Sequence, residues 1–138
     1  MIEERSAGIV IFRKENDKRL FLLLHYPSGH WDFVKGKIEK YENPREAAIR
    51  ETTEETGIKM LNFIENFEDS IEYNYQFEGK LVHKEVMFFL AYTSETEITL
   101  SHEHVDYAWL PFEEAYKKTT YDNAKSILSR ANIVLSES

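Results

Sequence analysis

Apolar side chains gather along the chain in short runs that are separated by polar and turn-forming residues. The runs at 6–13 and 19–26 are rich in isoleucine, leucine and phenylalanine, and the polar turn KENDK joins them. Two longer runs at 67–79 and 81–93 meet near a glycine. These four segments predict β-strands, arranged as two pairs that are each joined by a short turn.

The segment between these two pairs has the signals of a helix at both ends. Asn43 is a good N-cap, Pro44 suits the first helical position, and Glu46 completes an arrangement that resembles a capping box. Gly57 is well placed to end the helix in the left-handed conformation. The sequence therefore predicts a helix over residues 44–56.

The remaining segments complete the predicted architecture. The stretch 27–37 carries a proline, two glycines and two large aromatics, and we expect an ordered loop there. A polar stretch at 94–104 leads into the apolar run 105–110, one helix is predicted to start at Pro111, and a second is predicted over 121–135. Strands separated by helices at both ends of the chain predict an α/β (α+β) fold with a mixed sheet covered on two faces.

Composition narrows the class of protein without pointing to a reaction. The 138 residues include 42% apolar and 14% aromatic side chains, which predicts one folded domain over 1–138 with Trp31 and Trp109 as core anchors. No apolar run approaches the roughly 20 residues that span a bilayer, and the start of the chain lacks the features of a signal peptide. Together with the absence of cysteine, this predicts a soluble cytoplasmic protein without a membrane partner. The net charge of −8 disfavours long nucleic acid as a partner, but not a small anion held through a divalent cation.

Three glutamates of the helix predicted over 44–56 lie on one side of it. At 100° per residue, Glu51, Glu54 and Glu55 share an arc of about 100°. We expect the opposite side to pack against the sheet, so that the acidic side faces open space or a cleft. The residues on that opposite side are Ile49, Thr52, Thr53 and Thr56.

Two interpretations of this acidic side stay open from the helix alone. Like charges three or four residues apart cost a helix only about 0.2–0.5 kcal/mol per pair, so a solvated acidic surface is tenable. A hard divalent cation is the second interpretation, because Mg²⁺ commonly takes a few carboxylates together with water and phosphate oxygens. The residues around the helix decide between the two.

The spacing of residues 36–58 favours the cation. Gly36 is followed after five residues by Glu42, and after seven more by Arg50-Glu51-Thr52-x-Glu54-Glu55-x-Gly57-Ile58. This resembles the Nudix box, G-x5-E-x7-R-E-U-x-E-E-x-G-U, in which U is usually a bulky aliphatic residue. Seven fixed identities would match by chance in of the order of one in a million chains of this length. Thr52 departs from the pattern, and because threonine is about the size of valine we expect only a small packing penalty.

The resemblance implies an α/β/α sandwich that hydrolyses a nucleoside diphosphate linked to another moiety. The implied cofactor is Mg²⁺, for which Mn²⁺ can substitute. Arg50 would orient the carboxylates, which suits the rigid fork of its guanidinium, and Glu42 would help to hold the loop. The metal ligands that the resemblance implies are Glu51, Glu54, Glu55 and a backbone carbonyl near Gly36.

Segments outside the box are similar to one branch of the family, the asymmetric diadenosine tetraphosphate hydrolases of animals and archaea. These segments are RSAGIVIFR at 5–13, HWDFVKGKIE at 30–39 and LSHEHVDYAWLPFEEA at 100–115. The chain departs from that branch where FVKG stands in place of PPKG and EKYE in place of EPGE. The resemblance implies that Glu103 reaches an additional metal ion or acts as a base. It places Arg5, His30, Lys35 and Lys84 on the polyphosphate, and Tyr75 and Tyr121 on an adenine.

Two histidines beside Glu103 receive a structural interpretation. His102 and His104 flank Glu103, and alternation in an extended segment would turn both histidines away from it. Lys35 and Lys37 are expected to alternate as well, and of the two we favour Lys35 at the phosphates.

The expected reaction is in-line attack of a metal-activated water on a phosphorus of a small dinucleoside polyphosphate, which releases ATP and AMP from the tetraphosphate. Glu54, Glu55 and Glu103 could each serve as the base, and we take Glu54 first. Rival reactions of the same chemistry are removal of pyrophosphate from a 5′-triphosphate RNA end and cleavage of a nucleoside triphosphate. A Nudix module that senses a nucleotide without hydrolysing it is the non-enzymatic alternative. We expect a monomer or a weak dimer.

Overall fold

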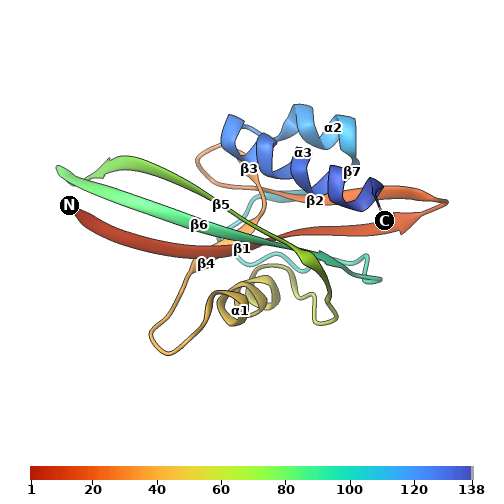
Figure 1. Cartoon of the computed structure of the whole chain (residues 1–138), viewed down its shortest axis with the longest axis horizontal. Coiled ribbons are helices and arrows are strands. Elements are labelled where there is room, and N and C mark those ends of the chain that lie inside the picture. Colours follow the sequence, from red (N-terminus) through yellow and green to blue (C-terminus); the bar gives the residue numbers. More distant parts are fainter. Residues whose placement is uncertain (138) are drawn as a thin grey trace.

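The computed structural model describes residues 1–137, and its strands and helices are shown in Figure 1. Within these residues, no helix has the length and apolar character that crossing a membrane requires. The elements in chain order are β1 (Ile2–Glu15), β2 (Lys18–His25), β3 (Trp31–Asp32), β4 (Val34–Lys37), α1 (Pro44–Thr56), β5 (Asn62–Phe77), β6 (Lys80–Tyr92), β7 (Asp106–Pro111), α2 (Phe112–Lys118) and α3 (Asp122–Ser136).

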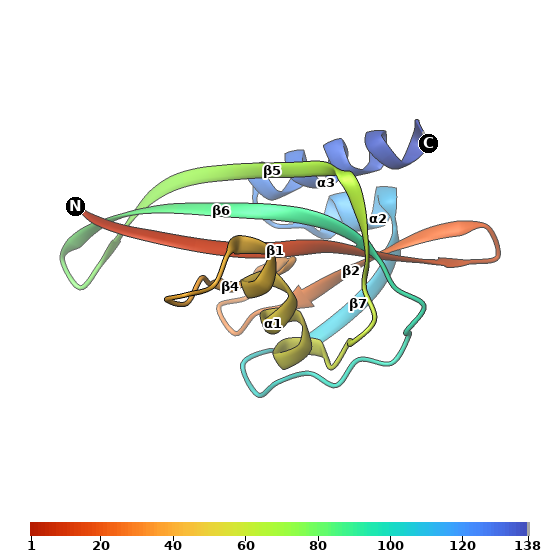
Figure 2. The same cartoon turned by 60° about the horizontal axis from the view of Figure 1, so that its bottom comes forward.

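In the described part of the chain, seven strands form one mixed sheet. The strand order is β3-β2-β1-β6-β5, with β4 paired to β1 and β7 paired to β2. β1 runs parallel to β6 and antiparallel to β2 and β4. α1 covers one face of the sheet, and α2 and α3 cover the other (Figures 1 and 2). This arrangement confirms the predicted α/β/α sandwich with a mixed sheet.

Alternate residues of β1 contribute to two hydrophobic cores, one on each face of the sheet. Val10 packs in the core under α2 and α3, whereas Ile9 packs in the core under α1. Trp31 packs against the edge of the first core and Trp109 against the edge of the second, and both are only partly buried. Successive side chains of a strand point to opposite faces. The polar residues of β1 are therefore divided between the two faces of the sheet, as its apolar residues are.

The bounds of α1 agree with the helix predicted over 44–56. The Asn43 side chain accepts a hydrogen bond from the Glu46 backbone N–H at 2.8 Å, and the Glu46 carboxylate accepts one from the Asn43 N–H at 2.9 Å. Gly57 ends the helix with φ of 79°. Both signals act within a few residues of the helix end, which is why the sequence alone predicts these bounds.

The predicted strand bounds need correction at three places, the first of which is β1, since it begins at residue 2 and not at residue 6. The loop predicted at 27–37 contains β3 and β4, and β4 pairs with β1 around Gly8↔Lys35. β4 forms a strand because it pairs with β1. Its own polar sequence lacks the apolar alternation from which a strand could be predicted. β5 begins at residue 62, before the predicted bound, because an irregularity between Phe63 and Glu68 interrupts its alternation.

The packed side of α1 agrees only in part with the predicted side, since Thr52 and Thr56 are buried as expected but the other two residues are not. Ile49 is 39% exposed and Thr53 is exposed, whereas Glu55 is only 4% exposed. Two adjacent alanines let the helix backbone lie close to the sheet, and Glu55 lies only about 20° around the helix from Ala48. The acidic side therefore turns partly toward the sheet instead of toward open space. The buried residues of α1 are Ala47, Ala48, Thr52, Glu55 and Thr56.

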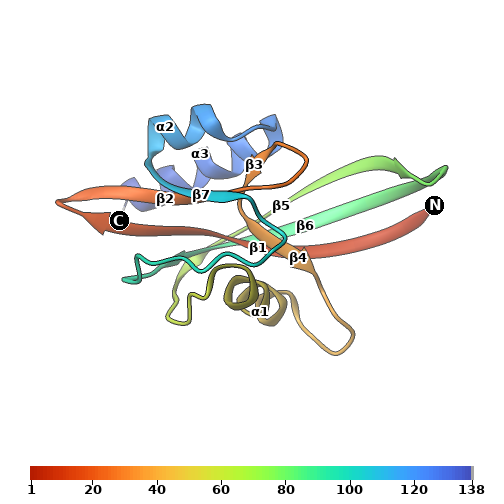
Figure 3. The ribbon, with the colours of Figure 1, turned by 180° about the vertical axis from the view of Figure 1, so that it is seen from behind.

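The segment between β6 and β7 runs beside the C-terminal end of α1 (Figure 3). The Thr99 N–H donates to the Thr56 carbonyl at 2.9 Å, and the Ser101 N–H donates to the Glu55 carbonyl at 3.2 Å. These bonds bring the turn that carries Glu103 to the acidic side of α1.

Candidate active site

Arg50 connects the carboxylates of the Nudix-like motif. Its Nε and Nη2 donate to the two oxygens of Glu42 at 2.7 and 3.0 Å. Its Nη1 donates to Glu51 at 3.0 Å and to Glu54 at 3.2 Å, and Nη2 also donates to the Lys37 carbonyl at 3.0 Å. The guanidinium thus holds helix and loop together and orients three carboxylates, the role that the resemblance assigns to Arg50.

Gly36 makes room for one of these carboxylates on β4. A Cβ atom at this position would lie 2.0 Å from Cδ of Glu51 and 2.3 Å from its Oε2. Heavy atoms that are not bonded to one another cannot approach so closely, so the Glu51 carboxylate can lie against the strand only beside a glycine. The backbone of β4 and the carboxylate of α1 therefore meet at this point.

Glu55 is a buried carboxyl group that makes no ion pair with a Lys or Arg side chain of residues 1–137. Its side chain is 5% exposed, and its Oε1 has no hydrogen-bond partner in the described structure. Burial, followed by a hydrogen bond with Glu51 and the charges of Glu51, Glu103 and Glu54, raises the pKa of Glu55 well above its ordinary value of 4.5. A cation bound beside Glu55 would oppose this shift.

The donor set fits a divalent cation. No three His, Asp or Glu side chains of residues 1–137 are already gathered as a metal site, and Arg50 bonds both Glu51 and Glu54. The buried oxygen of Glu55 that makes no hydrogen bond in the described residues and the carboxylate of Glu51 against Gly36 nevertheless match the oxygen ligands that a hard cation requires.

His104 is buried and lies against Glu55, an orientation that the sequence did not predict. Its Nε2 is 3.4 Å from Glu55 Oε1, and its Nδ1 is 3.2 Å from Ser101 Oγ. Residues 102–103 form a turn, so the alternation assumed for an extended segment does not apply. Burial, only partly opposed by the charges of Glu103 and Glu51, lowers the pKa of His104. His102 stays exposed on the turn.

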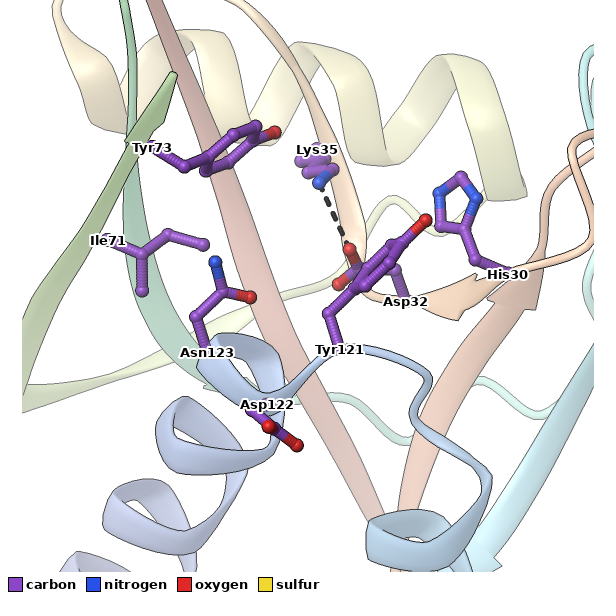
Figure 4. Close-up of a pocket in the computed structure, with 8 residues that line it drawn as sticks. All are labelled: His30, Asp32, Lys35, Ile71, Tyr73, Tyr121, Asp122 and Asn123. Carbon is purple, nitrogen blue, oxygen red and sulfur yellow. Dashed lines mark hydrogen bonds and ion pairs between the residues drawn. The ribbon is translucent and has the colours of Figure 1, made fainter. Parts of the chain in front are cut away.

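A cavity of about 500 Å³ opens on the face of the sheet that α3 covers (Figure 4). Tyr73 enters it from β5 and Tyr121 from the start of α3, and Lys35 points into the space toward Asp32. Of the predicted site residues, His30, Lys35 and Tyr121 are here. Tyr73 and Asp32 were not predicted, because only the pairing of β5 with β6 and the short β3 place them at the cavity. The residues that line it are His30, Asp32, Lys35, Ile71, Tyr73, Tyr121, Asp122 and Asn123.

Lys35 is held as a buried cation by Asp32. Its Nζ is 3.0 Å from Asp32 Oδ2, and Asp32 Oδ1 accepts a hydrogen bond from the Phe33 N–H at 2.7 Å. Burial lowers the pKa of Lys35, but the charge and hydrogen bond of Asp32, with Tyr73 and Tyr121, outweigh it and raise this pKa. Lys35 therefore presents a positive charge to any anion in the cavity.

Tyr26 connects the cavity with the acidic side of α1. Its ring stacks on His30 with centroids 4.6 Å apart and meets His104 edge-on at 4.6 Å, while its hydroxyl donates to the Phe33 carbonyl at 2.6 Å. On the other side, His30 lies 5.4 Å from the Tyr121 ring. Tyr26 closes a predicted strand, and nothing in its local pattern distinguishes it from a core residue.

The other predicted substrate residues lie outside the cavity lining. The Tyr75 hydroxyl donates to both oxygens of Glu4 at 3.1 and 3.2 Å, and Lys84 Nζ is 3.5 Å from Glu4. Arg5 is the next residue of β1, pairs with Glu85 at 3.4 Å, and has a side chain that is 58% exposed. Since neighbouring residues of a strand point to opposite faces, Arg5 and Lys84 are separated by the sheet.

The prediction that Lys35 and Lys37 alternate is wrong. Residues two apart in a strand point to the same face, and both lysines extend from β4 toward carboxylates on that face. Lys35 reaches Asp32, and Lys37 Nζ lies 3.4 Å from Glu4.

Comparison with known families agrees with the geometry of this site. The family model of the NUDIX domain matches residues 3–131. The chain belongs to the Nudix family. Members of this family generally use a divalent metal ion, and the carboxylates of α1 in this Nudix domain fit one.

Relatives of this Nudix domain match it over almost its whole length. It is 38% identical to the asymmetrical bis(5′-nucleosyl)-tetraphosphatase of Mus musculus, with 93% of this chain and 92% of the relative covered. It is 36% identical to the Caenorhabditis elegans protein of the same name, with 95% and 96% covered. The crystal structure of a C. elegans Ap4A hydrolase binary complex superimposes with a TM-score of 0.83 at 32% identity, covering 98% of this chain and 99% of that one.

Proposed function

We propose that this single domain hydrolyses dinucleoside polyphosphates with Mg²⁺, converting diadenosine tetraphosphate to ATP and AMP. The observation that carries the proposal is the pair of ring contacts by which Tyr26 links the carboxylate helix, through His104, to a cavity lined by His30, Lys35 and two tyrosines. The similarity to asymmetrical bis(5′-nucleosyl)-tetraphosphatases supports the choice of substrate.

Within this proposal, the side chains of α1 and β4 handle the reacting phosphate. Glu51, Glu54 and Glu55 hold the ion with the carbonyl near Gly36, and Glu103 serves an additional ion or the attacking water. Bound Mg²⁺ supplies charge neutralisation at the phosphates and lowers the pKa of a bound water. Arg50 keeps the carboxylates oriented for both tasks.

The remaining residues of the proposed site bind the polyphosphate and the adenine, and one of them accepts a proton. On the face of the sheet that α3 covers, Lys35 and Lys84 offset the charge of the polyphosphate and His30 adds a contact. Arg5 contacts the polyphosphate from the opposite face, where Glu54 accepts the proton of the attacking water. Tyr121 and Tyr75 stack on adenine, an interaction worth about 1–3 kcal/mol per base. Tyr73, which lines the cavity, joins these two as an aromatic surface for the base.

A chromatographic product assay tests the proposal against its rivals. Purified protein with Mg²⁺ is offered diadenosine tetraphosphate, 5′-triphosphorylated RNA and single nucleotides in parallel. We expect ATP and AMP in equal amounts from the first substrate and slower turnover of the others. ADP as the sole product, or turnover confined to the RNA, would refute the assignment.

A sensor without catalysis makes a different prediction. It would bind the dinucleotide tightly in calorimetry without Mg²⁺ and would release no product. We also propose that the enzyme is a cytoplasmic monomer or weak dimer.

A further inference from the structure

Glu4 is a partly buried carboxylate on β1 that side chains from three other strands contact. The Tyr75 hydroxyl on β5 donates to it at 3.1 and 3.2 Å, Lys37 Nζ on β4 lies at 3.4 Å, and Lys84 Nζ on β6 lies at 3.5 Å. Its side chain is 16% exposed. These contacts lower the pKa of Glu4 although burial raises it, so Glu4 is a stable anion.

This cluster continues the row of charges that begins in the cavity. Gly8 of β1 pairs with Lys35, and Glu4 of the same strand pairs with Lys84. Positions four apart on a strand share a face and lie about 13 Å apart. Burial and the charge of Lys35 lower the pKa of Lys84, while Glu4 opposes that shift, so the two lysines act on each other.

The row has more positive than negative charge, and Glu4 occupies part of it. Lys35 already has Asp32 as its partner, whereas Lys84 and Lys37 share the single carboxylate of Glu4. A carboxylate presents two acceptor oxygens with negative charge, as a phosphate group does. The lysine side chains are flexible point charges, so they can turn from Glu4 to another anion without movement of the strands.

We propose that Glu4 is an internal counter-ion that occupies Lys84 and Lys37 in the free protein and competes for them with the phosphates of the substrate. Glu4 thereby sets the affinity of this row for polyphosphate and keeps it from binding anions too tightly. The inference rests on the proposed function only in assigning Lys35 and Lys84 to phosphates. The class of ligand is an inorganic or nucleotide-linked polyphosphate chain.

Isothermal titration calorimetry with inorganic tripolyphosphate, without divalent metal, tests the inference on the whole protein. We expect Glu4→Gln to lower the dissociation constant by about fivefold, because one repelling charge beside the anion is removed while the shape is kept. Glu3→Gln is the matched control, since Glu3 is exposed on the other face of β1 and loses the same charge. Equal tightening in both variants would mean a general charge effect and would overturn the inference. Unchanged or weaker binding in Glu4→Gln would overturn it too, because Glu4 would then only hold the lysines in place.

A double-mutant cycle with Lys84 separates competition from other effects of Glu4. Lys84→Gln should weaken tripolyphosphate binding. Adding Glu4→Gln to this variant should restore little of the lost affinity, because Lys84 is no longer there to turn from Glu4 to the anion. A full fivefold gain in the Lys84→Gln background would contradict the inference. Thermal unfolding of each variant checks that the fold is kept.

Turnover provides a second readout that is independent of the first. With diadenosine tetraphosphate and Mg²⁺, Glu4→Gln should lower KM and leave kcat within about twofold. If the protein cleaves no dinucleotide, the proposed function fails, whereas the tripolyphosphate titration still decides the role of Glu4.

Discussion

At the scale of single residues, sequence neighbours in this site have opposite surroundings. The Glu54 side chain is 58% exposed, whereas that of Glu55 is 5% exposed and has an oxygen without a partner. The motif predicted both as carboxylate candidates, because it records identity and spacing. It could not predict that His104 would face Glu55, since a turn far along the chain decides that contact. Water therefore reaches Glu54, which Arg50 also contacts at 3.2 Å, more easily than it reaches the buried Glu55.

Glu54→Gln should remove the base and leave the fold unchanged. We expect kcat to fall by about 10²–10⁴-fold, the usual contribution of a general base, with no change in Tm because the side chain is exposed. Steady-state kinetics with diadenosine tetraphosphate and thermal unfolding measure the two effects. Glu114→Gln, exposed on α2, is the control for lost charge. Near-normal turnover in Glu54→Gln would reject the role assigned to it.

Glu55 should make the metal-free protein sensitive to pH. Its pKa is raised in the folded state above 4.5, its ordinary value, so the folded state holds the proton more strongly than the unfolded chain. The resulting stability is complete below pH 4.5 and is lost as the pH rises through the folded pKa.

The change Glu55→Gln removes that titration. Urea unfolding without metal should show a smaller loss of unfolding free energy between about pH 5 and pH 8 in the variant than in the unchanged protein. Added Mg²⁺ should stabilise the unchanged protein and have little effect on the variant. If the unfolding free energy changed equally with pH in both proteins, burial would not raise the pKa of Glu55.

At the scale of elements, the contact between α1 and β4 positions the carboxylates. The ends of α1 were predictable because the Asn43 cap and Gly57 act locally. β4 was not, because its pairing comes from β1 and its sequence has no apolar pattern. The resemblance named Gly36 only for a backbone carbonyl, and the structure adds that its missing Cβ admits the Glu51 carboxylate.

Gly36→Ala should disturb this contact, because the new Cβ would lie 2.0 Å from Cδ of Glu51. We expect a loss of about 1–3 kcal/mol in unfolding free energy, as for other overpacked sites, together with weaker Mg²⁺ activation. Urea unfolding measures the first effect. In the Glu51→Ala background, Gly36→Ala should lower the unfolding free energy only slightly, because the carboxylate that the new Cβ would displace is absent. An equal loss in both backgrounds would mean that the strain arises elsewhere.

At the scale of the whole molecule, the sheet separates the acidic helix from the cavity, and Tyr26 joins them at its edge. The three-layer arrangement followed from the order of predicted strands and helices. The lining of the cavity did not, because β5, β3 and the start of α3 come together only in the folded chain. His30, Lys35 and Tyr121 were found through resemblance, whereas Tyr73 and Asp32 required the structure.

Tyr121→Ala should weaken nucleotide binding with a smaller effect on the chemical step. Loss of one stacking contact of about 1–3 kcal/mol corresponds to a rise in KM of roughly 5- to 150-fold. Tyr116→Ala is the control, because Tyr116 is 40% exposed on α2 outside the cavity lining. Kinetics with diadenosine tetraphosphate measure KM and kcat, and unchanged values for Tyr121→Ala would remove it from the site.

The central claim is that the carboxylates of α1 bind Mg²⁺ against the phosphates of a dinucleotide. A crystal structure with Mg²⁺ and a nonhydrolysable diadenosine tetraphosphate tests it most directly. We predict ion density on Glu51 and Glu55 beside Gly36, with phosphate oxygens completing the coordination and an adenine against Tyr121. A bound dinucleotide with α1 bare of ions would contradict the claim.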